Sequence, residues 1–206
     1  MINIYKLKLT ILQQEILRFL FANNGKTFNA RNLAKALKVS QPAISKALPK
    51  LKKEEYITIN KDKESKRLSL NLNPEYPSIT GIKRAENLKL FYESGLAHFL
   101  LNRFPGTTII LFGSYSRGDD IFKSDIDIAI IGKKSIDIDL TKFEEILNKE
   151  IILQFYSNFK EIHKHLKENI YNGIVIGFVC MVWTCCINID ILYRMAEGLG
   201  NFMWKN

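Results

Sequence analysis

Apolar residues recur at helical spacing in three successive segments near the N-terminus. The first predicts an amphipathic helix over residues 9–22, with the following buried face: Ile11, Leu12, Ile16, Leu17, Leu20 and Phe21. A shorter helix is predicted over residues 28–37, with Asn29 as its N-terminal cap. A third helix is predicted to follow at once, because Ser40 is a capping residue type and Pro42 fits a first helical turn. Its predicted buried face consists of Ala43, Ile44, Leu48 and Leu51.

Two segments with the alternation of strands come next. Residues 56–59 and 67–72 place apolar side chains at every second position, and the loop between them is polar and rich in lysine. The turn-rich stretch 73–78 then breaks the pattern, which predicts a first domain over residues 1–77.

Helices and strands alternate in the rest of the chain. Helices are predicted over residues 80–103, 140–148 and 159–170, and strands over residues 107–112, 126–131, 150–156 and 173–178. This pattern predicts an α+β domain over residues 78–179. Residues 180–206 differ in composition and form an atypical apolar tail to which the sequence assigns no role.

The chemistry is concentrated between the strands predicted over residues 107–112 and 126–131. Asp125 and Asp127 are two residues apart along a strand, so both carboxylates project from one face, about 7 Å apart at their backbones. Close carboxylates favour a divalent cation such as Mg²⁺ or Mn²⁺. Gly113 and Ser114 offer backbone N–H groups and a hydroxyl to phosphate oxygens, and Arg117 adds further donors. These groups suit phosphoryl transfer.

The pattern Gly-Ser-x-x-x-Gly followed by Ser-Asp-Ile-Asp-Ile resembles the signature of the DNA polymerase beta-like nucleotidyltransferases, particularly the small, minimal members. The resemblance implies a nucleotidyltransferase fold, with a small mixed sheet flanked by helices, and a nucleoside triphosphate as substrate or ligand. It implies nucleotide binding by Gly113, Ser114, Arg117 and Gly118, and metal binding and catalysis by Asp125 and Asp127. The acceptor could be a protein hydroxyl, as in toxin-antitoxin pairs, a small molecule or a nucleic acid 3′ end.

One element of that pattern is missing. Active relatives carry a third carboxylate on the strand predicted here over residues 150–156, where the positions that align with it are Ile152 or Gln154. Three interpretations remain open: Glu150 reaches in from the strand's edge, two carboxylates hold one metal, or catalysis has been lost. A second Asp-Ile-Asp, at residues 137–139, is better explained as a helix N-terminal cap than as a metal pair.

The first 77 residues resemble a winged helix-turn-helix, the fold of many prokaryotic transcription regulators. The resemblance implies that the third helix enters the major groove of double-stranded DNA and that the wing touches its backbone. It implies that Gln41, Ser45 and Lys46 contact bases or phosphates. It also implies phosphate contacts by the following basic residues: Lys50, Lys53, Lys61, Lys63, Lys66 and Arg67. The alternative is a winged helix used for dimerisation or protein contact. A homodimer is compatible with either, although nothing in the sequence fixes one.

Charge separates the two halves of the chain. Residues 1–80 hold 15 Lys and Arg against 6 Asp and Glu, and residues 81–206 hold 15 of each, so the whole excess of +9 lies in the first segment. A basic first domain favours a polyanionic partner, although a lysine-rich surface can also serve solubility alone. The alternative function is therefore a DNA-binding transcriptional regulator whose second domain is catalytically degenerate and binds only nucleotide or a partner.

The cysteines and the C-terminal region bear on the compartment. Three cysteines, Cys180, Cys185 and Cys186, show no metal-like spacing, and no signal peptide opens the chain, which favours a reducing cytoplasm. Residues 171–189 are free of charge over a length close to a membrane span. Polar residues and glycines interrupt this stretch, and its first half fits a strand, so a membrane segment is the less favoured interpretation.

Overall fold

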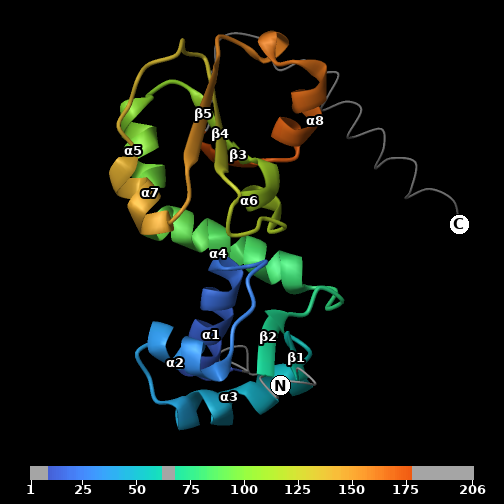
Figure 1. Ribbon diagram of the computed structural model, residues 1–206. Coiled ribbons are helices and arrows are strands. Elements are labelled where there is room, and N and C mark those ends of the chain that lie inside the picture. The colour runs from blue at the N-terminus through green and yellow to red at the C-terminus, as the bar shows by residue number, and fades with distance from the viewer. Residues whose placement is uncertain (1–8, 62–67, 178–206) are drawn as a thin grey trace, which may run out of the picture.

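The structure is a computed structural model that describes residues 9–61 and 68–177. A winged helix-turn-helix forms one end of the molecule and a sheet domain forms the other, with helix α4 lying crosswise between them (Figure 1). Within the described ranges, no helix is long and apolar enough to cross a membrane.

The N-terminal domain begins with three helices whose ends follow the capping residues. Helix α1 (Ile11–Ala22) starts at Thr10, which forms a capping box with Gln13. Asn29 caps α2 (Ala30–Ala36) and Ser40 caps α3 (Gln41–Lys53), so both predicted caps are confirmed. Strands β1 (Ile57–Lys61) and β2 (Leu68–Leu72) then pair in antiparallel fashion. Apolar side chains from all three helices and both strands share one core.

The single helix predicted over residues 80–103 is wrong, because the chain forms two helices there. Helix α4 (Ile79–Glu93) ends at Ser94, and α5 (Leu96–Arg103) begins after Gly95, which has a left-handed φ of +82°. The Ser94 hydroxyl donates to the carbonyl of Phe91 and accepts the N–H of Leu96, so it serves both helix ends. A residue in the left-handed conformation cannot continue a right-handed helix, and glycine adopts that conformation at little cost.

The C-terminal domain contains a four-stranded mixed sheet. Its strands are β3 (Thr108–Phe112), β4 (Ile126–Ile131), β5 (Ile151–Tyr156) and β6 (Ile174–Gly177), in the order β5-β4-β3-β6. The β4 and β5 strands are parallel, whereas β3 is antiparallel to both β4 and β6. The central strands are the most buried, because helices cover both faces of the sheet (Figure 1).

Each face of the sheet has its own core. Alternate residues of β3 and β4 pack with α5 and α7 (Thr141–Leu147), through Ile109, Leu111, Ile128, Ile130, Leu100 and Phe143. The intervening residues pack with Ile162, which follows the 3₁₀ helix η1 (Phe159–Glu161), and with α8 (Lys164–Tyr171), through Ile110, Phe112, Ala129, Ile131 and Ile170. The region predicted as one helix over residues 159–170 is thus a 3₁₀ turn followed by a helix.

Helix α4 contributes to both domains. Ile79 in its first turn is buried in the winged-helix core, whereas Phe91 near its end is buried in the core of the sheet domain. The predicted division into residues 1–77, 78–179 and 180–206 stays a prediction. The predicted tail, with Cys180, Cys185 and Cys186, lies outside the described residues, as do wing residues Lys63, Lys66 and Arg67.

Candidate functional site

The candidate site lies where strand β3 gives way to the short helix α6 (Gly113–Arg117). Gly113 has a left-handed φ of +74°, which turns the chain sharply out of the strand. Phe112 pairs with Asp127 in the sheet, so the residue that follows Phe112 lies beside this aspartate. The predicted phosphate-binding turn and the predicted metal-binding strand are therefore adjacent.

The contact between Gly113 and Asp127 leaves no room for a larger residue. A Cβ atom on Gly113 would lie 2.2 Å from Oδ2 of Asp127 and 3.1 Å from its Cγ. Glycine is favoured here for two reasons, because the conformation is left-handed and because a larger residue would displace the Asp127 carboxylate. The Asp127 carboxylate thereby packs directly on the backbone at the start of α6.

Charge around Asp127 has the character expected of a cation site. Burial raises the pKa of the Asp127 carboxyl, Asp125 raises it further, and Arg117 acts in the opposite direction. Two carboxylates that repel one another are stabilised when a divalent cation binds between them. Both are hard oxygen donors, so these residues fit a magnesium or manganese ion as two of its ligands.

The two other predicted nucleotide-binding residues differ in their surroundings. Arg117 is exposed and its Nε lies 3.1 Å from Oδ2 of Asp119, and its charge acts on Asp127. Gly118 is buried against α4, where an added Cβ would lie 2.3 Å from the carbonyl oxygen of Thr80. A larger residue at position 118 would therefore clash with the backbone of α4.

The register of β5 shows which residues flank the two aspartates. Ile152 pairs with Asp127 and Gln154 pairs with Ala129, so the side chain directly beside Asp127 is apolar. Glu150 lies just before β5 and is exposed. Within residues 9–61 and 68–177, no group of three or more His, Cys, Asp and Glu side chains could together hold a metal ion.

The second Asp-Ile-Asp has a local structural role. Oδ1 of Asp139 accepts the N–H of Thr141 at 3.0 Å, at the start of α7. Hydrogen bonding with the Thr141 side chain, and then with its backbone, lowers the pKa of the Asp139 carboxyl. Asp139 thus accepts the first N–H of α7, which agrees with a helix N-terminus here, although the N-cap position itself is Leu140 and makes no side-chain capping bond.

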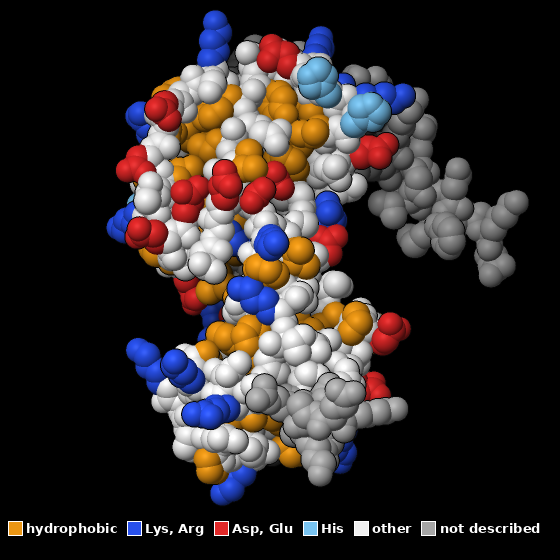
Figure 2. All heavy atoms as spheres, in the orientation of Figure 1, with side chains coloured by type: hydrophobic (Ala, Val, Ile, Leu, Met, Phe, Trp, Pro, Cys, Tyr) orange, Lys and Arg blue, Asp and Glu red, His pale blue; other side chains and the backbone are white. Residues whose placement is uncertain are grey.

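The predicted DNA-binding residues of α3 share its outer surface. These residues are all exposed: Gln41, Ser45, Lys46, Lys50 and Lys53. Helix α3 lies at the end of the molecule farthest from the sheet domain (Figure 1). In the view of Figure 2, acidic side chains gather on the sheet domain, and basic side chains are prominent on the winged-helix domain. Lys61 ends β1, and the predicted wing contacts beyond it lie outside the described residues.

Sequence reasoning missed a buried cluster of charges. The carboxylate of Asp120 is ion-paired with Lys83 and Lys149, and all three side chains are at least 95% buried. The amide of Asn87 also donates to Asp120, at 2.7 Å. The sequence did contain a sign of this cluster. Lys83 and Asn87 lie between Ile79 and Phe91 at intervals of four residues, so these polar residues share the buried face of α4.

Two family models match the two parts of the chain separately. A family described as "Nucleotidyltransferase domain" matches residues 94–176, and one described as "MarR family" matches residues 9–69. A curated protein of Methanocaldococcus jannaschii, named "Putative protein adenylyltransferase", is 44% identical over 70 residues, which cover 26% of this chain and 70% of that protein.

Two solved structures of regulators each cover about half of the chain. The adhesin competence repressor AdcR of Streptococcus pyogenes is 26% identical, covers 50% of this chain and 72% of its own, and gives a TM-score of 0.38. ZitR of Lactococcus lactis in complex with DNA is 24% identical, covers 52% of this chain and 69% of its own, and gives a TM-score of 0.35. Both scores are below 0.5, so these likenesses do not define the arrangement of the chain.

The chain thus combines a nucleotidyltransferase domain with a winged-helix domain. The chain belongs to the nucleotidyltransferase family and carries a MarR-family domain at its N-terminus. Proteins of this class act on nucleoside triphosphates.

Proposed function

We propose that this protein transfers a nucleoside monophosphate from a nucleoside triphosphate to an acceptor hydroxyl, and that its winged helix binds double-stranded DNA. The observation that carries the proposal is the packing of the Asp127 carboxylate on Gly113. A Cβ atom added to Gly113 would lie only 2.2 Å from Oδ2 of Asp127. This packing brings a cation ligand against the turn whose backbone would meet phosphate oxygens.

Each residue of the site has a role in this proposal. Asp125 and Asp127 hold Mg²⁺ or Mn²⁺, and Gly113 with Ser114 binds the triphosphate. When bound, the metal neutralises charge on the phosphates as the bond to pyrophosphate breaks. Arg117 donates to phosphate oxygens, which requires it to exchange its ion pair with Asp119 for the ligand.

The acceptor is proposed from the relative's name. Because the similar archaeal protein is named as a protein adenylyltransferase, ATP and a hydroxyl on a protein are the first pair to test. A toxin as the acceptor, in a toxin-antitoxin pair, fits this proposal, and so does modification of a second copy of the chain. A small molecule and a nucleic acid 3′ end remain open as acceptors.

DNA binding is assigned to the outer surface of α3 and to the wing. Lys46, Lys50 and Lys53 lie at intervals of four and three residues, so they form one cationic ridge on the exposed side of the helix. Such a ridge suits the phosphates that flank a major groove. A homodimer would allow two copies of α3 to meet a symmetrical site. We place this protein in the cytoplasm, where DNA and triphosphates meet.

A second candidate function is supported by Ile152. In polymerase-type chemistry a third carboxylate orients or deprotonates the attacking hydroxyl, and the residue beside Asp127 cannot do either. The alternative is therefore a DNA-binding regulator whose second domain binds a triphosphate and does not transfer it.

The experiment that tests transfer uses two labels in parallel. The full-length protein is incubated with Mg²⁺, a cell extract and ATP labelled on either the α- or the γ-phosphate. Transfer of a nucleoside monophosphate leaves the α-label on an acceptor and releases the γ-label in pyrophosphate. The Asp125→Asn, Asp127→Asn double variant keeps the shapes of both side chains and should label nothing. Binding of ATP without labelling would instead favour the regulator.

A further inference from the structure

The two halves of the candidate site are joined by one short loop, residues 118–125. It begins at the end of α6, where the phosphate-binding turn lies, and it ends at Asp125, just before β4. A displacement of this loop therefore moves Arg117 at one end and the cation ligand Asp125 at the other. The groups that hold the loop set the geometry of the site.

The sheet domain and α4 hold the loop through its buried charges. Asp120 is 1% exposed and receives Lys83 from α4 and Lys149 from the segment before β5. The ammonium group of Lys149 also donates to the carbonyls of Ile121 at 2.7 Å and Ser124 at 3.1 Å. Moving a buried carboxylate away from its two cations would leave buried charges unpaired, which is strongly destabilising, so Asp120 is held in place.

The winged-helix domain holds the same loop from the other side. The side-chain amide of Asn24, in the turn after α1, donates to the carbonyl of Asp120 at 3.1 Å. The backbone carbonyl of Asn24 accepts the N–H of Phe122 at 3.0 Å. Beside this pair of bonds, the ammonium of Lys26 lies 4.2 Å from the centre of the Phe122 ring.

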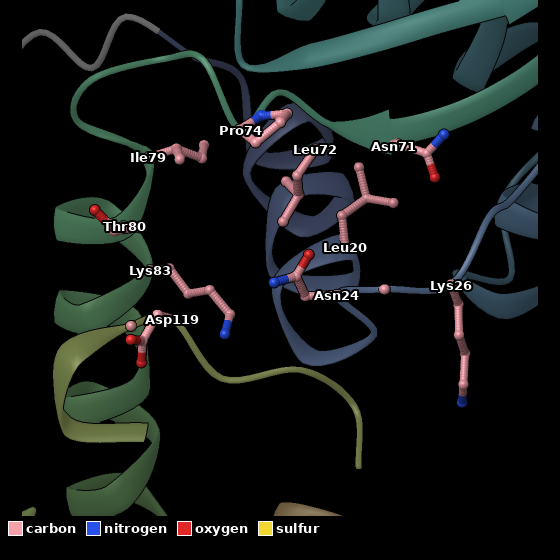
Figure 3. Close-up of a pocket in the computed structure, with 12 residues that line it drawn as sticks. Leu20, Asn24, Lys26, Asn71, Leu72, Pro74, Ile79, Thr80, Lys83 and Asp119 are labelled. Carbon is pink, nitrogen blue, oxygen red and sulfur yellow. The ribbon is translucent and has the colours of Figure 1, made fainter. Parts of the chain in front are cut away.

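These contacts border a cavity of about 350 Å³ between the two domains. Figure 3 shows Asn24, in the turn after α1, and Lys83, in α4, pointing toward one another, and the carbonyl of Asp120 accepts from both. One backbone carbonyl of the loop is thus shared by a side chain of each domain. The loop cannot follow one domain without straining its bond to the other.

We propose that Asn24 and Asp120 are positioning residues of the nucleotide site, so that the winged-helix domain completes a site whose ligands all lie in the other domain. This inference rests on the proposed function, because it assigns Asn24 a role in triphosphate binding at Gly113, Ser114, Asp125 and Asp127. By linkage, a movement of the winged helix on DNA that stretches the Asn24 bond alters triphosphate affinity, and bound triphosphate alters DNA affinity by the same factor.

The chain supplies a matched control for Asn24 in its neighbour. Asn23 lies in the same turn, but its amide donates to the carbonyl of Phe19 within the winged helix. Asn23→Ala and Asn24→Ala each remove one amide from the end of α1, and only the second removes a bond to the sheet domain. Asn24→Asp, which keeps the shape and loses the donor, should behave as Asn24→Ala does.

The test measures the full-length protein in three ways. Amide hydrogen exchange of residues 119–125 should be faster in Asn24→Ala than in Asn23→Ala. The dissociation constant for ATP with Mg²⁺ should rise about fivefold, which corresponds to the loss of one hydrogen bond. In turnover, KM for ATP should rise by the same factor while kcat changes less than about twofold, because bound triphosphate and metal fix the loop again. Mere loss of folded protein would lower kcat and leave KM unchanged.

The outcomes separate this inference from the proposed function. Equal loop exchange and equal ATP affinity in Asn23→Ala and Asn24→Ala overturn the inference, whether or not transfer occurs. If the wild-type protein binds ATP without releasing pyrophosphate, transfer is refuted, and the difference in affinity between the two variants still supports the positioning role. If the wild-type protein binds no triphosphate with Mg²⁺, both proposals are overturned.

Discussion

Replacement of Gly113 by alanine should disable the site while the fold survives. Gly113 has φ +74°, and an L-residue in the left-handed region costs roughly 1–2 kcal/mol. The new Cβ would stand 2.2 Å from Oδ2 of Asp127, and ordinary contact begins at 3.4 Å, so the two atoms must separate by a further 1.2 Å. A displacement of about 1 Å of a reacting or coordinating group costs on the order of 10²-fold in rate.

Gly106 provides the control for this substitution. Its φ of +78° is nearly the same, and nothing lies within 4 Å of an added Cβ. Gly106→Ala therefore has the backbone cost of Gly113→Ala without the collision with Asp127. Thermal unfolding should show a loss of stability in both variants, and the Gly113 variant should be the less stable because its neighbours must also shift.

The assay compares both variants in Mg²⁺-dependent ATP titration and in pyrophosphate release. We expect Gly113→Ala to lose about 10²-fold in rate and Gly106→Ala to remain close to the wild-type protein. The reasoning is refuted if Gly113→Ala binds and turns over ATP as Gly106→Ala does, because the carboxylate would then not depend on this contact.

Three further predictions concern the DNA surface, the pH dependence and the missing carboxylate. Alanine at all three basic residues of the α3 ridge should lower the slope of log affinity against log salt for duplex DNA by about 3; these residues are Lys46, Lys50 and Lys53. An unchanged slope in a binding titration over several salt concentrations would exclude this surface. The raised pKa of Asp127 means that protons compete with the metal as the pH falls toward that pKa, so ATP affinity with Mg²⁺ should decrease as the pH is lowered toward it. Arg117→Gln removes a group that lowers this pKa and should move the loss to higher pH, whereas Arg117→Lys should not; equal pH profiles for the two variants would contradict the assignment. Stability without metal should depend on pH in the opposite direction from ATP affinity. Because the carboxyl pKa is raised in the folded protein, the free energy of unfolding should decrease as pH rises from the ordinary value of 3.8 through the raised pKa. Ile152→Asp places a carboxylate beside Asp127 and should raise the rate of pyrophosphate release by about 10²-fold if the third carboxylate limits catalysis, and Ile152→Asn should not; equal rates in both variants would show that it does not.

Local signals in the sequence were enough to place most elements of the first domain. Asn29 and Ser40 cap α2 and α3 because their side-chain oxygens accept N–H groups within three residues, which is a relation that the sequence itself contains. The alternation of apolar residues likewise placed β1 and β2 to within about a residue at most ends, since one face of each is buried.

The helix predicted over residues 80–103 was wrong because the backbone conformation of one residue, Gly95, determines where α4 ends. The residues around Gly95 keep helical spacing on both sides, so the periodic pattern continues through a point at which the chain leaves the helix. Glycine tolerates a helix interior at modest cost, and only the left-handed φ seen in the structure shows that this one ends α4.

The sequence predicted the candidate cation ligands of the site, and it did not predict the residues that hold the loop between them and the phosphate-binding turn. Asp125 and Asp127 stand out because carboxylates two residues apart on an apolar strand are unusual. Asp120 looks like any surface aspartate, because its partners Lys83 and Lys149 are 37 and 29 residues away along the chain. Such long-range partners become visible only when the fold brings them together, and so does the bond from Asn24.

The most direct test of the central claim is a titration of the purified full-length protein with ATP, with and without Mg²⁺, in parallel with a measurement of pyrophosphate release in the presence of cell extract. We predict that binding requires Mg²⁺, that pyrophosphate is released, and that both are lost in the Asp125→Asn, Asp127→Asn variant. Binding that is independent of Mg²⁺ and unchanged in this variant would contradict the assignment of the two aspartates as the cation ligands. It would also remove the basis for transfer at Gly113 and Ser114.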